Sequence, residues 1–288
     1  MNTRTNRRGF LKGLGAVAAS LGTGGLASAF PAAGSQAKTA VRGLRLGLAS
    51  YSFRAFKPEQ ALNMTKSLGV TRLSVKDMHL PLDESQTGIR SFISKARSRG
   101  LETYAGGVIY MKTDADVVQA FTYAKMAGLE LIVGVPNLEL LPRIEEWVTS
   151  TNIKLAIHNH GPEDKVFPSP ESIYTRIQTR DMRIGLCMDI GHTMRCGLDP
   201  AASAVNCFDR LIDIHGKDVS EDTEKGVTVE AGRGVIDIPS LFRVLIQKGY
   251  AGTVSLEYEK DERDPLAGAA ESIGYFRGVL AGLGAQAL

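Results

Sequence analysis

Short apolar runs alternate with amphipathic stretches eight times between residues 44 and 283 of this 288-residue chain. The apolar runs have the length of strands and are apolar throughout, which is typical of parallel strands that are covered by helices. We expect strands at 44–50, 72–76, 102–108, 130–135, 154–158, 183–188, 211–215 and 253–257. Eight strand–helix units in succession predict an α/β fold of the (β/α)8 TIM barrel type.

Helix boundary signals agree with this alternation. We expect helices at 58–68, 86–99, 114–127, 138–150, 170–180, 200–208, 239–248 and 265–283. Proline stands at five of the predicted helix starts and glycine follows four of the predicted ends, as helix capping favours. An open doubly wound sheet would need a phosphate-binding glycine pattern after an early strand, and the first strand is followed by Tyr51-Ser52-Phe53 instead. We therefore expect a single barrel domain over residues 44–288.

The first 29 residues resemble a twin-arginine export signal. Arg7-Arg8 precede a weakly apolar stretch, and Ala27-Ser28-Ala29 has the small-x-small pattern of a cleavage site. The apolar stretch is short and rich in glycine and alanine, so we expect removal rather than a permanent membrane anchor. We predict a signal peptide at 1–29, a flexible tail at 30–43, and a periplasmic or extracytoplasmic mature protein.

Charge and cysteine content argue against two classes of protein. Cleavage after Ala29 removes four of the 34 basic side chains and none of the 31 acidic ones, which leaves a nearly neutral chain. A nucleic-acid-binding protein needs a basic surplus or stripe, so no nucleic-acid partner is expected. The three cysteines, Cys187, Cys196 and Cys207, do not form a disulfide framework. Cys187 is expected in the core, on a strand.

All five histidines of the chain fall at or just after the end of a predicted strand. They are His79, His158, His160, His192 and His215. Asp189 and Glu257 close the sixth and eighth strands, Lys76 ends the second, and Lys217 lies two residues beyond His215. Because the active sites of such barrels lie at the C-terminal ends of the strands, these side chains are expected to converge on one mouth.

Two imidazoles and two carboxylates are a ligand set that suits a divalent ion of borderline hardness. They fit neither a thiolate site nor an all-oxygen calcium site. The predicted ligands are His158, Asp189, His215 and Glu257, one from each of the last four strands. Manganese, cobalt and zinc are ions of this kind.

Several strand ends resemble motifs of the sugar phosphate isomerase/epimerase family of xylose isomerase-like barrels, which includes the ketose 3-epimerases. The motifs are Asp189-x-x-His192, His215-x-Lys217-Asp218, the Gly-Arg-Gly-x-Ile-Asp run at 232–237 and Ser255-Leu256-Glu257. The resemblance covers the chain from Leu44 to its end. It implies that four strand-end residues hold one divalent ion that binds adjacent oxygens of a keto-sugar, with manganese as the expected ion and cobalt, zinc or magnesium as alternatives. Two glutamates of the family then move a proton beside the carbonyl, one on each side of the sugar.

The chain departs from the ketose 3-epimerase pattern at the end of the fifth strand, where His158 stands in place of a glutamate. Only Glu257 remains as a base in its expected place. The candidates for a second proton carrier are His160, His192, Lys76, Glu163 and Asp164. Two reactions stay open: isomerisation or epimerisation of an unphosphorylated keto-sugar, and elimination of the aglycone from a 3-keto-glycoside by a lyase. Export favours the lyase mildly, because glycosides are met outside the cytoplasm.

The remaining roles follow from position at the mouth. We expect Glu257 to be both ligand and principal base, with Lys76, His160 and His192 as further catalytic groups. The expected substrate-binding residues are His192, Lys217, His79, Arg233 and Tyr51. A small sugar or glycoside is the expected partner, and a homo-oligomer and a sugar dehydrogenase that first oxidises the substrate are further possibilities. A nuclease of related barrel ancestry, or a non-catalytic sugar-binding module, agrees less well with the charge balance and with the acids present.

Overall fold

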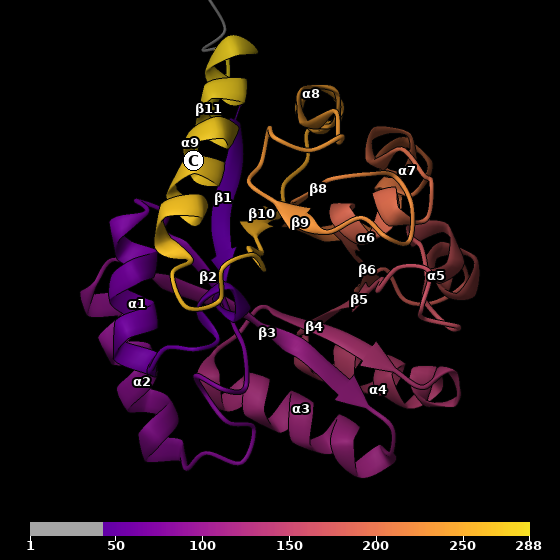
Figure 1. The fold of residues 1–288 in the computed structure, drawn as a ribbon. Helices are drawn as coiled ribbons and strands as arrows, with labels where there is room; N and C mark the ends of the chain where they lie inside the picture. The colour runs from indigo at the N-terminus through magenta and orange to yellow at the C-terminus, as the bar shows by residue number, and fades with distance from the viewer. Residues whose placement is uncertain (1–42) are drawn as a thin grey trace, which may run out of the picture. The chain divides into compact units, whose positions relative to one another are not determined.

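The computed structural model describes residues 43–288, so the predicted export signal and nearly all of the predicted tail lie outside the described residues. Eight parallel strands form a closed ring, and Figure 1 shows the helices arranged around them. The strands are β1 (Gly43–Ala49), β2 (Arg72–Val75), β3 (Glu102–Met111), β4 (Leu131–Pro136), β5 (Lys154–His158), β6 (Ile184–Asp189), β7 (Leu211–Gly216) and β10 (Thr253–Leu256). Each pairs with the next, and β10 pairs with β1. The predicted (β/α)8 barrel is confirmed.

The helices lie between the strands in the predicted order. They are α1 (Pro58–Ser67), α2 (Gln86–Ser98), α3 (Asp114–Ala127), α4 (Leu141–Thr151), α5 (Pro170–Ile177), α6 (Ile190–Arg195), α7 (Pro200–Asn206), α8 (Ile238–Lys248) and α9 (Leu266–Gly282). Gly128 and Gly249 take left-handed φ angles of 67° and 71° at the ends of α3 and α8, as helix C-caps favour. None of the described helices is long and apolar enough to cross a membrane.

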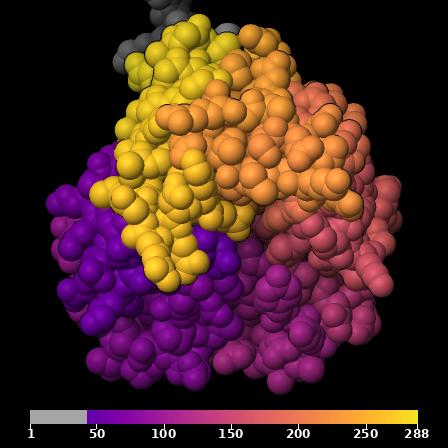
Figure 2. All heavy atoms as spheres, viewed as in Figure 1, coloured from indigo at the N-terminus to yellow at the C-terminus, as the bar shows by residue number. Residues whose placement is uncertain are grey.

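Short elements supplement the eight units. Single 3₁₀ turns cover Ser50–Phe53, Leu138–Leu140 and Phe208–Arg210. After β7 the chain forms a two-stranded antiparallel hairpin from β8 (Asp218–Val219) and β9 (Thr228–Val229). The last strand, β11 (Gln286–Ala287), pairs with the start of β1. In Figure 2 the yellow C-terminal part of the chain borders the indigo N-terminal part on the surface.

Alternation along each strand decides which side chains enter the barrel. On β5, Leu155 and Ile157 pack in the large apolar cluster between strands and helices, and Ala156 belongs to the small cluster inside the ring. Because strand side chains alternate, His158 shares the inner side with Ala156. The same alternation on β6 places Met188 outside and Cys187 inside, so Asp189 also points inward. Polar ends of several strands are thus directed to one place.

Candidate active site

The four predicted metal ligands come together at the C-terminal ends of β5, β6, β7 and β10. One ligand atom from each of them lies within 4.8 Å of the ligand atoms of the other three. They are His158, Asp189, His215 and Glu257, and all four are buried. His215 Nδ1 lies 3.1 Å from His158 Nε2 and 3.2 Å from Glu257 Oε2. His158 Nε2 in turn lies 3.6 Å from Asp189 Oδ2.

Asp189 has two structural tasks, and its two oxygens divide them. Oδ1 accepts a hydrogen bond of 2.7 Å from the backbone N–H of His192 and so caps α6, which begins directly after β6. Oδ2 faces the cluster. The strand end is held in place by Asn159, whose side chain accepts from the Asp189 N–H at 2.9 Å and donates to the Asp189 carbonyl at 3.2 Å. These bonds fix the direction in which Oδ2 points.

A buried lysine supplies a positive charge beside the cluster. Lys217 Nζ lies 3.0 Å from Asp189 Oδ2, 3.0 Å from Glu257 Oε2 and 2.9 Å from Glu259 Oε2. Burial would lower the pKa of the ammonium, but the carboxylates raise it well above its ordinary value. Glu259 was not among the predicted site residues. Its position two residues after Glu257 gives the signal, since alternation places both on the same side of the chain.

The two buried acids are held in their charged form. Burial alone would raise the pKa of Asp189 and of Glu257. The Lys217 ammonium together with the His192 and His158 rings outweighs burial at Asp189, and the His215 ring together with Lys217 does so at Glu257, so that both pKa values fall well below their ordinary range. Burial also lowers the pKa of His158 to about 3, so this ring is neutral at physiological pH and has a lone pair to offer.

The donor set fits one divalent ion. Within the described chain, Asp189 Oδ2 is buried and accepts no hydrogen bond of good geometry; its charged neighbour is the Lys217 ammonium at 3.0 Å, and it also faces two imidazoles and a second carboxylate. Burial would lower the pKa of His215, but Cys187 and Glu257 beside it raise that pKa well above its ordinary value, so this ring is charged before an ion binds. Once the ring has lost its proton, three carboxylates and one ammonium leave two net negative charges, which a divalent ion would balance. Imidazole nitrogens with carboxylate oxygens suit zinc, cobalt or manganese better than calcium.

A cavity of about 240 Å³ opens beside this cluster. It is lined by Tyr51, Lys76, Val108, Tyr110, His158, His160, His192, Glu257 and Glu259. Five of the predicted catalytic and binding residues, Glu257 among them, therefore lie on its wall together with the predicted ligand His158. Tyr110 reaches the wall because β3 continues three residues beyond its predicted end, to Met111. Its hydroxyl lies 3.2 Å from His160 Nε2, and the two rings are stacked.

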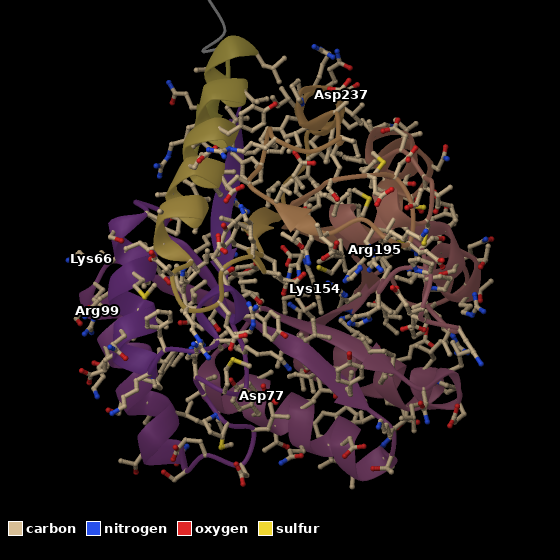
Figure 3. All side chains as sticks on the ribbon, viewed as in Figure 1. Lys66, Asp77, Arg99, Lys154, Arg195 and Asp237 are labelled. Carbon is tan, nitrogen blue, oxygen red and sulfur yellow. The ribbon has the colours of Figure 1, made fainter. Side chains whose placement is uncertain are left out.

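The charged and titratable groups of the wall are also defined. Burial lowers the pKa of His160 and of His192, which favours neutral rings. Lys76 Nζ donates to the carbonyl of Val108 at 2.6 Å and lies 3.2 Å from Asp77 Oδ1. Arg195, labelled in Figure 3 at the end of α6, lies 3.2 Å from His192 Nδ1 and pairs with Glu163, one of the loop acids considered as a proton carrier.

Three residues that we expected to bind substrate lie elsewhere. His79 is buried against the loop after β1, with ring nitrogens 2.9 Å from Ser50 Oγ and 3.2 Å from the Phe53 carbonyl. Arg233 forms an exposed pair of hydrogen bonds with Glu271, of 2.5 and 2.7 Å. Lys217 is 2% exposed and lies with its carboxylates rather than on the cavity wall. In this structure the three side chains contact other protein groups and do not line the cavity.

The Gly-Arg-Gly run has a structural explanation in Asp218. One Asp218 oxygen accepts from the N–H groups of Gly232 and Gly234 at 2.9 and 3.0 Å, and the other accepts from Ile236 and Val219. A Cβ on Gly234 would lie 2.2 Å from this carboxylate, so only glycine fits there. The motif residues 217–218 and 232–237 therefore build one loop around the buried carboxylate.

Comparisons with known proteins agree with this architecture. The family model described as xylose isomerase-like TIM barrel matches residues 138–279. The rhizopine catabolism protein MocC of Rhizobium meliloti is 27% identical over 136 residues, which are 42% of this chain and 41% of that protein. The match thus spans about two fifths of the length of this curated relative.

Solved structures resemble the chain over most of its length. A D-tagatose 3-epimerase-like protein has a TM-score of 0.69 at 17% identity, covering 84% of this chain and 98% of its own. The IOLI protein, solved with a bound zinc atom, has a TM-score of 0.69 at 16% identity, covering 83% and 99%. The closed ring of eight strands and these structural matches show a (β/α)8 barrel, and its second half is similar to the xylose isomerase-like TIM barrel family.

Proposed function

We propose that the protein is a divalent-metal-dependent enzyme that removes the proton next to the carbonyl of an unphosphorylated keto-sugar and forms an isomer or epimer. The observation that carries this proposal is the convergence of His158, Asp189, His215 and Glu257 beside a cavity of about 240 Å³ whose wall includes Glu257. The structural likeness to a D-tagatose 3-epimerase-like protein supports the same class of reaction.

The chain's residues divide the work as follows. One divalent ion held by the four ligands, manganese in our expectation, would act as a Lewis acid on the sugar carbonyl. The close contacts of Glu257 with His215 and Lys217 use Oε2, so Oε1 is the oxygen that accepts the proton. Its lowered pKa keeps this carboxylate ionised at neutral pH, which a base requires. Tyr51 and His192 on the wall orient the sugar.

Return of the proton to the opposite face needs a second carrier. Glu259 also lines the cavity, but it follows Glu257 by two residues and shares Lys217 with it, so it does not supply a base from the other side. His160 and Lys76 project from other strand ends onto the same wall. We assign the second proton transfer to one of these two residues.

The test is exchange with solvent. Manganese-loaded protein is incubated with free ketoses in D2O and followed by NMR, with deuterium incorporation or inversion beside the carbonyl as the expected result. Glu257→Gln should reduce turnover by about 10²-fold to 10⁴-fold at equal metal content, because it removes the proton acceptor. Glu146→Gln, which removes an exposed acid paired with Arg143, is the matched control. Full activity of Glu257→Gln would refute the assignment.

A lyase is the second candidate, because His158 occupies the position where a second carboxylate base is expected. In that reaction Glu257 takes the C2 proton of a 3-keto-glycoside, a C1–C2 double bond forms, and the C1–O bond breaks with its electron pair leaving on the aglycone. The same NMR assay with a 3-keto-glucoside separates the two. Release of the aglycone with the ketoses untouched would replace the isomerase proposal.

We also propose export by the twin-arginine route, on the basis of residues 1–29 alone. Replacing both Arg7 and Arg8 by lysine should retain the protein in the cytoplasm, as measured by fractionation and immunoblotting. A periplasmic location of this double variant would contradict the proposal.

A further inference from the structure

A buried thiol lies directly beside the four-residue cluster. Cys187 is on β6, where it pairs in register with His158 of β5 on one side and with Asp213 of β7 on the other. Its side chain is fully buried. The thiol sulfur and one ring nitrogen each of His158 and His215 all lie within 4.8 Å of one another. The two histidines thus belong to two overlapping groups of potential ligands.

We propose that His158, Cys187 and His215 form a second ligand set at this centre, which binds a thiophilic divalent ion such as zinc, cobalt or cadmium. The carboxylate set, with Asp189 and Glu257, then serves harder ions such as manganese. Both sets use the same two histidines, so the two modes exclude each other. This inference shares two residues with the proposed function, but it requires neither a sugar nor turnover.

The hydrogen-bond partners of these side chains, within the described residues, support a ligand set of two imidazole nitrogens and one sulfur. His158 Nδ1 and His215 Nε2 are both buried without a hydrogen-bond partner, on side chains that are 2% and 0% exposed. The carboxylates of Asp189 and Glu257, in contrast, already lie 3.0 Å from the Lys217 ammonium. An ion bound by the carboxylates must compete with that ammonium, whereas an ion bound between the imidazoles and the thiol leaves it in place.

The thiol is weakly held in its present contact. Cys187 Sγ lies 3.9 Å from Asp213 Oδ2, a long distance for a weak donor. Asp213 is held independently by Tyr104, whose hydroxyl lies 3.0 Å from each of its oxygens. Loss of the thiol proton would therefore not release Asp213. On binding, the S–H bond breaks, the sulfur electron pair forms the bond to the ion, and the proton passes to the solvent buffer.

The ligand chemistry then sets ion preference. Thiolate and imidazole ligands favour zinc and similar ions, whereas manganese and magnesium favour oxygen ligands. Three protein ligands leave one coordination position open, as in zinc sites that keep a place for water or substrate. The centre of this chain is therefore expected to hold zinc or cobalt more tightly than a purely carboxylate and histidine site would.

Cobalt substitution tests the proposal directly. The full-length protein is titrated with Co²⁺, and sulfur-to-cobalt charge-transfer absorption in the near ultraviolet is expected to rise with the cobalt d–d bands. The charge-transfer band should disappear in Cys187→Ser and persist in Cys207→Ser, because Cys207 packs in the outer apolar cluster at the end of α7. The Kd for zinc relative to that for manganese should rise about tenfold or more in Cys187→Ser.

Several outcomes would overturn the inference. Cobalt d–d bands without a charge-transfer band in the unmodified protein would place the ion on the carboxylate set only. If the protein does not bind cobalt at all, neither ligand set forms a site for this ion. A charge-transfer band that survives in Cys187→Ser would assign it to another cysteine. Should Cys187→Ser not fold, zinc X-ray absorption of the unmodified protein still decides, since a sulfur ligand gives a scattering shell at about 2.3 Å. The ketose assay fails or succeeds independently of these spectra.

Discussion

Replacing Lys217 by methionine removes the only cation that we find in contact with both buried acids of the described site. The ammonium is 2% exposed and lies 3.0 Å from Asp189 Oδ2 and from Glu257 Oε2. Removing one partner of a buried ion pair costs about 3 to 5 kcal/mol, because the remaining charge stays buried without compensation. Glu259 is 30% exposed and adds little, since water can solvate it. We expect a loss of about 4 kcal/mol in the free energy of unfolding.

The assay is thermal unfolding of metal-free protein in the presence of a chelator. A loss of this size corresponds to a fall in Tm of about 10 °C for a domain of this length. Lys225→Met, on an exposed loop, is the control and should change stability by less than about 0.5 kcal/mol. A divalent ion should stabilise Lys217→Met more than the unmodified protein, because it replaces the missing charge. A variant as stable as the unmodified protein without metal would refute the reasoning.

Two further predictions concern the loop beside the site. Asp218→Ala leaves four backbone N–H groups without their acceptor and should lower the free energy of unfolding by about 1 to 3 kcal/mol in urea denaturation, whereas the exposed Asp209→Ala should not. Lys260 and Tyr258 lower the pKa of Glu230 from 4.5 to about 2, so the stability it contributes is complete above pH 4.5 and is lost as the pH falls towards 2. Glu230→Gln should flatten this part of the pH dependence of Tm, and an unchanged slope would contradict the assignment.

The barrel and the convergence of the strand ends follow from local patterns. Continuous apolar runs indicate parallel strands, and alternation within each run directs His158 and Asp189 to the inner side. Alternation predicts on which side of a strand a side chain lies, but it does not predict how far along the barrel axis its charged end reaches. Lys217 follows His215 on the same side, so its direction was predictable. Whether its ammonium reaches a sugar or turns to the carboxylates depends on contacts with Glu257 and Glu259, which follow the neighbouring strand β10.

Short elements and loop contacts could not be predicted from the sequence for a similar reason. Helix α6 has six residues, too few to show a helical period, and it begins because Asp189 caps it. His79 stands at a strand end like the other histidines, but its ring bonds to the loop after β1 rather than facing the cavity. Such contacts join residues far apart in the sequence, and position at a strand end does not reveal them.

The charge of residue 158 tests whether the ligand at this position selects the ion that the centre binds. When His158 and His215 are both neutral, the site carries two net negative charges, which one divalent ion balances. His158→Glu would add a third, replace a borderline ligand by a hard one, and remove a member of the proposed thiol set. Without metal, the added buried carboxylate should destabilise the protein through repulsion from Asp189 and Glu257. With metal, the ratio of the Kd for zinc to the Kd for manganese should rise about tenfold, as measured by competition titration.

His158→Gln is the neutral control, in which both ions should bind more weakly while metal-free stability stays above that of the glutamate variant. If His158→Glu binds the two ions in the original ratio, the donor at this position does not select the ion, and the carboxylates of β6 and β10 alone must do so.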